Sequence, residues 1–312
     1  MNWVLGVDGG GSKTLMALAS PEGQVQGPFR AEGVNPFDNA SWKQHLTGLL
    51  QQLPCSGSEI AYAALGLPGY GEVPRVSAEQ VETVGTALTQ TAFAVLNDVE
   101  VAFVGAHPGQ AGVLILSGTG SMAWAASAHR QLRVGGWGDG FGDEGSAYWI
   151  GQRALGSLSK ALDGRLEDPG FASGMLEAIG ARDGEGLLEW FYRLEHPRSG
   201  IARLAQSVDR LAGQGNPTAR ALLKLAADEL VLLAQAAFRQ LGDPAAHHFS
   251  YAGSVFNSAL IKAWVGEALQ PLGTWAPPAL PPIGGALLYA ARKAGWPVDP
   301  GWIARLKQEL QD

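Results

Sequence analysis

The sequence predicts an α/β protein built from two similar lobes, and three observations carry this prediction. An apolar run leading into a Gly-x-Gly-Ser turn occurs as VLGVDGGGS at residues 4–12 and again as VLILSGTGS at residues 113–121. After each turn, segments with strand-like alternation give way to segments with helical spacing. The chain of 312 residues is long enough for two domains of ordinary size. We therefore expect an N-terminal lobe over residues 1–111 and a C-terminal lobe over residues 112–312.

Strands and helices are expected to alternate through the first lobe. Short apolar runs bounded by turn residues predict strands, and apolar residues spaced three and four apart predict helices. The expected strands are 3–8, 14–19, 60–67 and 91–96. The expected helices are 41–52, 77–89 and a short one ending at 104.

The second lobe opens in the same way and then becomes mostly helical. Its first expected strands are 112–117, 121–127 and 131–135. A glycine-rich loop then leads into a helix over 146–162, and the longest helix spans 217–241. Because this long helix is apolar nearly all round, we expect it at the centre of a helical insertion. The last helix is expected at 302–310, and the pattern does not say which lobe it packs against.

The composition excludes several classes of function. A net charge of −7 and the lack of any Lys/Arg cluster argue against a nucleic-acid partner or an anionic membrane surface. The longest uncharged stretch, residues 111–128, is interrupted by Gly, Ser and Thr, so no membrane span is expected. The single cysteine, Cys55, can form neither an intrachain disulfide nor a Cys-rich metal site. These features favour a cytoplasmic protein.

The paired glycine turns predict phosphate binding. Glycine leaves backbone amides unshielded, and a turn at a strand end presents them as a concave set of donors for an anion. In the first turn the Ser12 hydroxyl and the Lys13 ammonium would add to these donors, and Asp8 is placed to hold hydrated Mg²⁺ or to cap the turn. Two such turns would hold one polyphosphate between the lobes.

Two other nucleotide motifs fit less well. A Walker A loop needs glycine directly before Lys-Ser/Thr and a helix after it, whereas Ser12 intervenes here and a strand follows. GTGSMA at 118–123 formally satisfies a dinucleotide fingerprint, but it opens a hairpin rather than a helix.

Carboxylates near strand ends are candidates for acid–base and sugar-binding roles. Asp98 follows a buried strand and could accept the proton of an attacking hydroxyl during phosphoryl transfer. Capping of the following helix by Asn97-Asp98 fits equally well. The glycine-rich loop combines an indole with carboxylates, which suits the binding of sugar hydroxyls: Trp137, Asp139, Asp143 and Glu144. The last two acids also suit the first turn of the helix that follows.

Five segments in order resemble the phosphate, connecting and adenosine motifs of the sugar kinase/heat-shock protein/actin superfamily: LGVDGGGSKT, LNDVEVAF, LSGTGS, YAGSV and PPIGGALL. Within it, GWGDGFGDEGSAYWIGQRAL resembles the N-acetylglucosamine kinase branch of the family that also holds the benzoyl-CoA reductase activator ATPases. The resemblance spans about residues 4–290. It implies two ribonuclease-H-like, actin-like ATPase lobes with an interlobe cleft. It also implies ATP and Mg²⁺ as cofactors and phosphorylation of N-acetylglucosamine to its 6-phosphate.

The resemblance implies roles for individual residues. Asp98 would be the base for the sugar 6-hydroxyl, and Asp8 would serve Mg²⁺. The nucleotide would be bound by the two turns and the adenosine motif: Gly9, Gly10, Gly11, Ser12, Lys13, Thr14, Gly118, Thr119, Gly120, Ser121, Gly253 and Ser254. The sugar would be contacted by Asn35, Asp98, Thr119, Gly120, Asp143 and Ala147. Met122 stands where some members have Asn, which removes a polar contact to the sugar.

Two alternatives stay open. A kinase for glucosamine, glucose or another hexose would use the same ATP chemistry on a different acceptor. An ATPase switch acting on a protein partner would hydrolyse ATP without any sugar. The activator ATPases bridge two subunits through a cysteine-held iron–sulfur cluster, for which Cys55 alone is insufficient. Many relatives are dimers, and the sequence is compatible with a homodimer.

Overall fold

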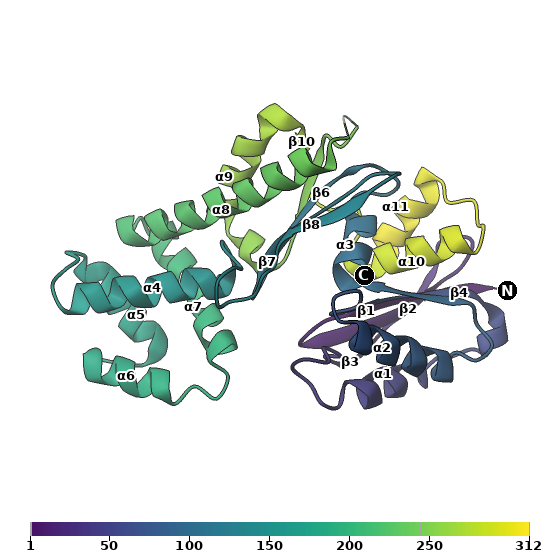
Figure 1. Cartoon of the computed structure of the whole chain (residues 1–312), viewed down its shortest axis with the longest axis horizontal. Coiled ribbons are helices and arrows are strands. Elements are labelled where there is room, and N and C mark those ends of the chain that lie inside the picture. Colours follow the sequence, from purple (N-terminus) through teal and green to yellow (C-terminus); the bar gives the residue numbers. More distant parts are fainter. Residues whose placement is uncertain (1, 244, 312) are drawn as a thin grey trace. The chain divides into compact units, whose positions relative to one another are not determined.

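The computed structural model, which describes residues 2–243 and 245–311, forms two compact units (Figure 1). The first unit combines the residues up to 109 with those from 277 onward, and the second consists of residues 110–276. The expected division placed residues 277–312 in the second lobe and left open which lobe the last helix packs against. The structure instead places this segment in the first unit, because its helix α10 (Pro282–Lys293) packs against the first sheet.

The first unit is built on a five-stranded sheet with the order β3-β2-β1-β4-β5. Antiparallel pairing joins β1 to β2 and β2 to β3, whereas β4 and β5 run parallel to β1. The strands are β1 (Trp3–Gly9), β2 (Lys13–Ala19), β3 (Val25–Glu32), β4 (Ile60–Leu67) and β5 (Phe93–Asn97). The other helices are α1 (Trp42–Leu50), α2 (Pro74–Ala87), α3 (Asp98–Ala106) and α11 (Pro300–Glu309).

Alternation along β1 explains how both faces of this sheet are covered. Leu5 and Val7 point to the core shared with α1, and Val4 points to the core shared with α10. Gly6 lets α10 approach closely, since a Cβ at that position would lie 2.8 Å from Leu287 Cγ. This close approach fixes the C-terminal segment to the first unit.

The second unit repeats the same sheet topology, with the order β10-β9-β6-β7-β8. Its strands β6, β7 and β8 form an antiparallel meander, and β9 and β10 run parallel to β6. The strands are β6 (Gly112–Ser117), β7 (Ser121–Ala126), β8 (Gln131–Gly135), β9 (His248–Ala252) and β10 (Thr274–Trp275). The prediction of two similar α/β lobes is therefore confirmed.

Helices fill the chain between β8 and β9, as the sequence predicts. They are α4 (Ala147–Leu162), α5 (Pro169–Ile179), α6 (Gly184–Tyr192), α7 (Pro197–Gly213) and α8 (Pro217–Leu241), and α9 (Ala259–Leu269) follows β9. The long helix α8 begins where Asn216 accepts a hydrogen bond from the amide of Ala219 and ends at Gly242 in the left-handed conformation. It packs against the sheet strands as well as α4, α7 and α9, which places it at the centre of the unit.

No helix in the described part of the chain combines the length and apolar character of a membrane-spanning segment.

Candidate active site

The first glycine turn joins β1 to β2 in the first unit. Gly10 N donates to Lys13 O at 2.9 Å, which closes the hairpin around the exposed residues Gly11 and Ser12. The chain after β3 packs directly on this turn, because a Cβ on Gly33 would lie only 2.0 Å from Gly11 O. The amide of Val34 also donates to Gly10 O at 3.0 Å. The turn is therefore held from behind, and its tip faces solvent.

Three of the predicted phosphate ligands lie at the end of this turn in different environments. Ser12 and Lys13 are exposed and can reach a ligand. Thr14 is fully buried, and its Oγ1 donates to Glu32 O at 2.9 Å. The Thr14 hydroxyl thus holds β2 to β3, which the motif alone did not reveal.

The second glycine turn occupies the equivalent place between β6 and β7 but has a different register. Gly9 pairs with Thr14 across the first hairpin, whereas Ser117 pairs directly with Ser121 across the second. The second turn is consequently one residue shorter, and Gly118 N donates to Gly120 O at 2.9 Å within it. The two turns share a topological position, but their Gly-x-Gly-Ser letters do not superpose residue by residue.

Internal hydrogen bonds tie the second turn to the glycine-rich loop and to α4. Ser117 Oγ donates to Gly145 O at 3.0 Å, and Ser121 Oγ donates to Glu144 O at 2.6 Å. The amide of Ala147, a predicted sugar contact, donates to Gly118 O at 2.8 Å. The Ser121 hydroxyl is therefore engaged in the fold, and the loop and the turn form one connected structure.

Asp143 lies at the centre of this connected structure. The residue as a whole is 3% exposed, and it is the one non-glycine residue of the described chain that has a positive φ, 55°. Oδ2 accepts a hydrogen bond from Arg198 Nη2 at 2.8 Å, and Oδ1 accepts one from the Ser121 amide at 3.4 Å. A Cβ on Gly120 would lie 2.7 Å from Oδ2. Three predicted sugar or phosphate residues thus meet here, together with Arg198, which the sequence analysis missed.

Asp8 and Asp98 lie at the same edge of the first sheet. Asp8 is paired with Gly66 of β4, and the next β4 residue, Leu67, is paired with Asn97 at the end of β5. Because carboxyl ends of parallel strands meet at one edge, the two carboxylates are neighbours, and this edge is where α/β sheets place ligands.

The pKa values of both carboxyls reflect this setting. Burial raises the pKa of Asp8 to about 7; the charge of Asp98 adds to the rise, and that of Lys13 opposes it. Burial also raises the pKa of Asp98 to about 6; the Val99 amide opposes this rise, and the charge of Glu72 adds to it. Asp98 is therefore a carboxylate near neutral pH with an appreciable affinity for a proton, which suits a general base.

The capping alternative for Asn97-Asp98 is resolved by geometry. Asn97 Oδ1 accepts from the Val99 amide at 3.0 Å as the N-cap of α3, and its Nδ2 donates to Tyr70 O at 2.8 Å. Asp98 is the first residue inside the helix, and its Oδ1 also accepts from the Val99 amide at 3.0 Å. Asn97, rather than Asp98, is therefore the N-cap of α3.

Asn35 lies in the loop after β3, where its side chain is committed to local bonds. Its Oδ1 accepts from the Phe37 amide at 3.2 Å, and its Nδ2 donates to Asp38 Oδ2 at 2.5 Å. Phe37 rests on the loop that follows β4, since a Cβ on Gly69 would lie 2.5 Å from its ring. In the loop after β4, Tyr70 O accepts the hydrogen bond from Asn97 Nδ2, and Asn97 directly precedes Asp98. Asn35 therefore belongs to the same group of loops as Asp98.

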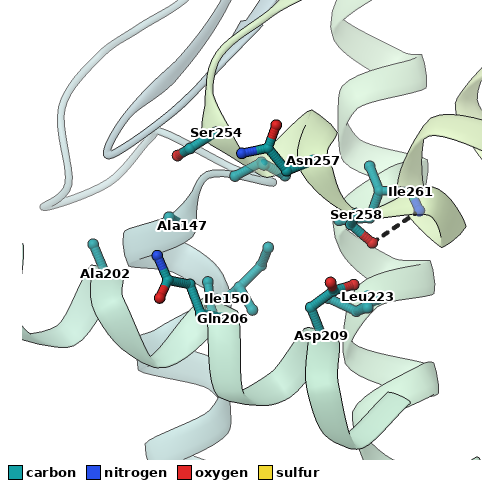
Figure 2. A pocket seen from close by; sticks show the side chains of 12 residues that line it. Ala147, Ile150, Ala202, Gln206, Asp209, Leu223, Ser254, Asn257, Ser258 and Ile261 are labelled. Carbon is teal, nitrogen blue, oxygen red and sulfur yellow. Dashed lines mark hydrogen bonds between the residues drawn. The ribbon is translucent and has the colours of Figure 1, made fainter. Parts of the chain in front are cut away.

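The second unit contains a cavity of about 290 Å³ beside its glycine turn (Figure 2). Its lining is mostly apolar: Ala147, Ile150, Ala202, Ala205, Leu223, Val255 and Ile261. Its polar lining residues are Gln206, Asp209, Ser254, Asn257 and Ser258. Figure 2 shows Gln206 and Asp209 on α7 facing the segment that carries Asn257 and Ser258. The size and lining suit a small organic ligand such as a nucleoside.

The adenosine motif connects this cavity to the glycine turn. Gly253 has φ 99°, and a Cβ there would lie 2.2 Å from Ser117 O. The next residue, Ser254, lines the cavity. The predicted pair Gly253 and Ser254 is thus placed against the second turn, while Gln206, Asp209 and Asn257 are cavity residues that no sequence motif indicated.

The donor set at Asp8 fits Mg²⁺ that arrives with a nucleotide. In the described part of the chain no group of three or more His, Cys, Asp and Glu could enclose a metal ion. Mg²⁺ in nucleotide enzymes is held by one or two carboxylates and completes its shell with water and phosphate oxygens. The negative charge of Asp98 helps to raise the pKa of Asp8, and a cation bound at Asp8 would offset that negative charge.

We expect Asp8→Asn to stabilise the ligand-free protein at pH 8. A carboxyl whose pKa is higher in the folded state than the ordinary 3.8 favours folding at low pH and loses that contribution as pH rises to about 7. The Tm of the variant should exceed that of the unmodified protein by about 2–4 °C at pH 8, with the gap shrinking toward pH 4. Scanning calorimetry without Mg²⁺ checks this, with Asp228→Asn on α8 as control. A gap independent of pH would contradict it.

Comparison with known proteins places the chain in a family. The model of the BadF/BadG/BcrA/BcrD ATPase family matches residues 5–290. The chain belongs to this ATPase family. An N-acetylmuramic acid/N-acetylglucosamine kinase from Clostridium acetobutylicum is 30% identical over 252 residues, which cover 76% of this chain and 79% of that protein. A glucosamine kinase from Vibrio cholerae is 25% identical, covering 94% of this chain and 97% of that protein.

Solved structures confirm the fold of this ATPase. A protein from Chromobacterium violaceum described as an N-acetylglucosamine kinase has TM-score 0.71 and 26% identity, covering 92% of this chain and 98% of that chain. A glucokinase from Streptomyces griseus in complex with glucose and AMPPNP has TM-score 0.57 and 15% identity, covering 93% and 98%. The predicted actin-like ATPase architecture is therefore correct.

Proposed function

We propose that this protein is an ATP-dependent kinase that phosphorylates an amino sugar, foremost N-acetylglucosamine at O6. The observation that carries the proposal is the placement of Asp98 beside Asp8 at the carboxyl edge of the first sheet, with its pKa raised to about 6. Relatives described as kinases of N-acetylglucosamine and glucosamine support the choice of acceptor.

In the proposed reaction Asp98 takes the proton of the sugar 6-hydroxyl. The oxygen forms a bond to the γ-phosphorus, the bond to the β–γ bridging oxygen breaks, and ADP leaves with that electron pair. Such transfer depends mainly on positioning and on neutralising charge. Asp8 would hold Mg²⁺, which supplies positive charge to the phosphates when bound.

The nucleoside is proposed to occupy the cavity lined by α4, α7 and the residues after Gly253. The carboxylate of Asp209 would repel phosphates, so the triphosphate would leave the cavity at Ser254, beside the 118–120 turn. The family resemblance implies that the exposed residues Gly11 and Ser12 also bind phosphate.

Filling this cavity should weaken ATP binding selectively. Ala205 lines the cavity from α7, so Ala205→Trp is expected to raise the KM for ATP by a factor on the order of 10 or more while the sugar KM changes less than about twofold. Arg203→Trp, at an exposed position of the same helix, is the control. Steady-state kinetics with each substrate varied in turn decides the outcome, and an unchanged ATP KM would place the nucleoside elsewhere.

The residues proposed to contact the sugar are those that the family resemblance implies: Asn35, Asp98, Thr119, Gly120, Asp143 and Ala147. A second candidate acceptor is glucosamine, because the glycine-rich loop holds three carboxylates and a free ammonium would need such a partner. The 25% identical glucosamine kinase of Vibrio cholerae supports this candidate.

ADP release measured over a sugar panel with Mg-ATP tests the proposal. We expect the highest kcat/KM with N-acetylglucosamine, lower values with glucosamine and glucose, and little ADP release without sugar. ADP release that no sugar changes, but that a protein partner raises, would favour the ATPase switch instead.

A further inference from the structure

We propose that Arg198 is a positioning residue that holds Asp143 in place for the sugar and thereby sets the sugar affinity. The inference rests on the proposed function, in which Asp143 is a sugar contact. Arg198 is the second residue of α7, and it lies 55 positions along the chain from Asp143.

The backbone at Asp143 needs an external restraint. A φ of 55° is uncommon for residues with a Cβ, although Asp adopts it more often than most, and here the carboxylate is buried as well. The Ser121 amide lies at a long 3.4 Å, so the 2.8 Å charge-assisted bond from Arg198 is the stronger restraint. Without it, a buried carboxylate would be left with its charge uncompensated.

The position of Arg198 has no evident purpose within its own helix. A cation in the first turn of a helix faces the positive end of the helix dipole, which is unfavourable. Its side chain is 45% exposed, so core packing does not explain it either. Two of the three carboxylates in the glycine-rich loop supply the compensation, with Arg198 Nε 3.8 Å from Asp139 Oδ1 and Nη2 2.8 Å from Asp143 Oδ2.

The planar guanidinium can address both acids at once. Nε lies in ion-pair range of Asp139, at the start of the DGFGDEG segment, and Nη2 on the same edge of the guanidinium binds Asp143 near the end of that segment. A lysine ammonium keeps the charge but cannot present two donors in the fixed geometry of a guanidinium edge. Arg198 therefore fixes the span of the loop as well as the orientation of the Asp143 carboxylate that would accept hydrogen bonds from sugar hydroxyls.

Kinetics of three variants test this role. Arg198→Gln should raise the sugar KM by a factor on the order of 10 or more, with the ATP KM within about twofold, and Arg198→Lys should recover part of the loss. The ATP KM is an internal check, because Ala202, one turn further along α7, lines the nucleoside cavity. Arg203→Gln, on the exposed side of the same helix, should match the unmodified protein.

A double-mutant cycle identifies the residue through which Arg198 acts. In an Asp143→Asn background, Arg198→Gln should raise the sugar KM by less than about threefold. The Asp143→Asn substitution has already weakened the hydrogen bond between residues 198 and 143, so little of it is left to lose. An unchanged sugar KM in Arg198→Gln, additive effects in the cycle, or equal rises in both KM values would overturn the proposal. These outcomes presuppose an active unmodified protein. If the unmodified protein phosphorylates no sugar, the proposed function fails, and the role of Arg198 fails with it.

Discussion

Replacement of Asp98 by asparagine is expected to lower sugar-dependent ADP release by a factor on the order of 10² or more. The amide cannot take the proton of the sugar hydroxyl, although it has nearly the same size and can still accept the bond from the Val99 amide. Asn97 keeps the cap of α3, so the fold should persist. Steady-state ADP release at saturating sugar and ATP measures the loss.

Two further measurements separate lost chemistry from lost structure. Calorimetric ATP binding by Asp98→Asn should stay within about threefold of the unmodified protein, because the proposed nucleoside cavity lies in the second unit. Asp228→Asn, exposed on α8, should retain full turnover. Near-normal turnover in Asp98→Asn would remove this residue from the role of base.

Gly253→Ala is expected to destabilise the protein by about 2–4 kcal/mol and to abolish measurable ATP binding. The new Cβ would lie 2.2 Å from Ser117 O, and the φ of 99° is strained for any residue with a side chain. Relief of this clash must move either the Ser117–Gly118 turn or the segment that lines the nucleoside cavity. Urea unfolding and ATP calorimetry measure the two effects.

A glycine without such constraints is the matched control. A Cβ on Gly156, inside α4, would meet nothing within 4 Å. Gly156→Ala should therefore leave ATP binding unchanged and stabilise the helix by about 0.5–1 kcal/mol. A Gly253→Ala protein that is as stable as this control and binds ATP normally would contradict the account of the cavity.

Local sequence signals predicted the parts of the molecule that short-range physics controls. The apolar runs beside each glycine turn became β1 and β6, because alternating or buried β-branched runs bounded by turns form strands. Asp8 and Asp98 could be proposed as candidates because both come at the end of a buried strand. The recurrence of the turn at residues 118–120 predicted the repeated sheet topology.

Long-range packing decided what the sequence could not show. The assignment of α10 to the first unit depends on Gly6 and on the fit of Leu287 against it, and no local pattern encodes that contact. Arg198 reaches the loop residue Asp143 from helix α7, and Asp209 and Asn257 line one cavity that only the fold creates. The register difference between the two turns was also invisible, because both carry the same Gly-x-Gly-Ser letters.

Identifying which sugar oxygen is phosphorylated tests the central claim, phosphorylation of N-acetylglucosamine at O6, most directly. The protein is incubated with Mg-ATP and N-acetylglucosamine, and phosphorus NMR assigns the phosphorylated oxygen while ADP is quantified in parallel. The account predicts one ADP per N-acetylglucosamine 6-phosphate and no sugar-dependent ADP release with the 6-deoxy analogue. Phosphate on another hydroxyl, or equal ADP release with the 6-deoxy sugar, would contradict it.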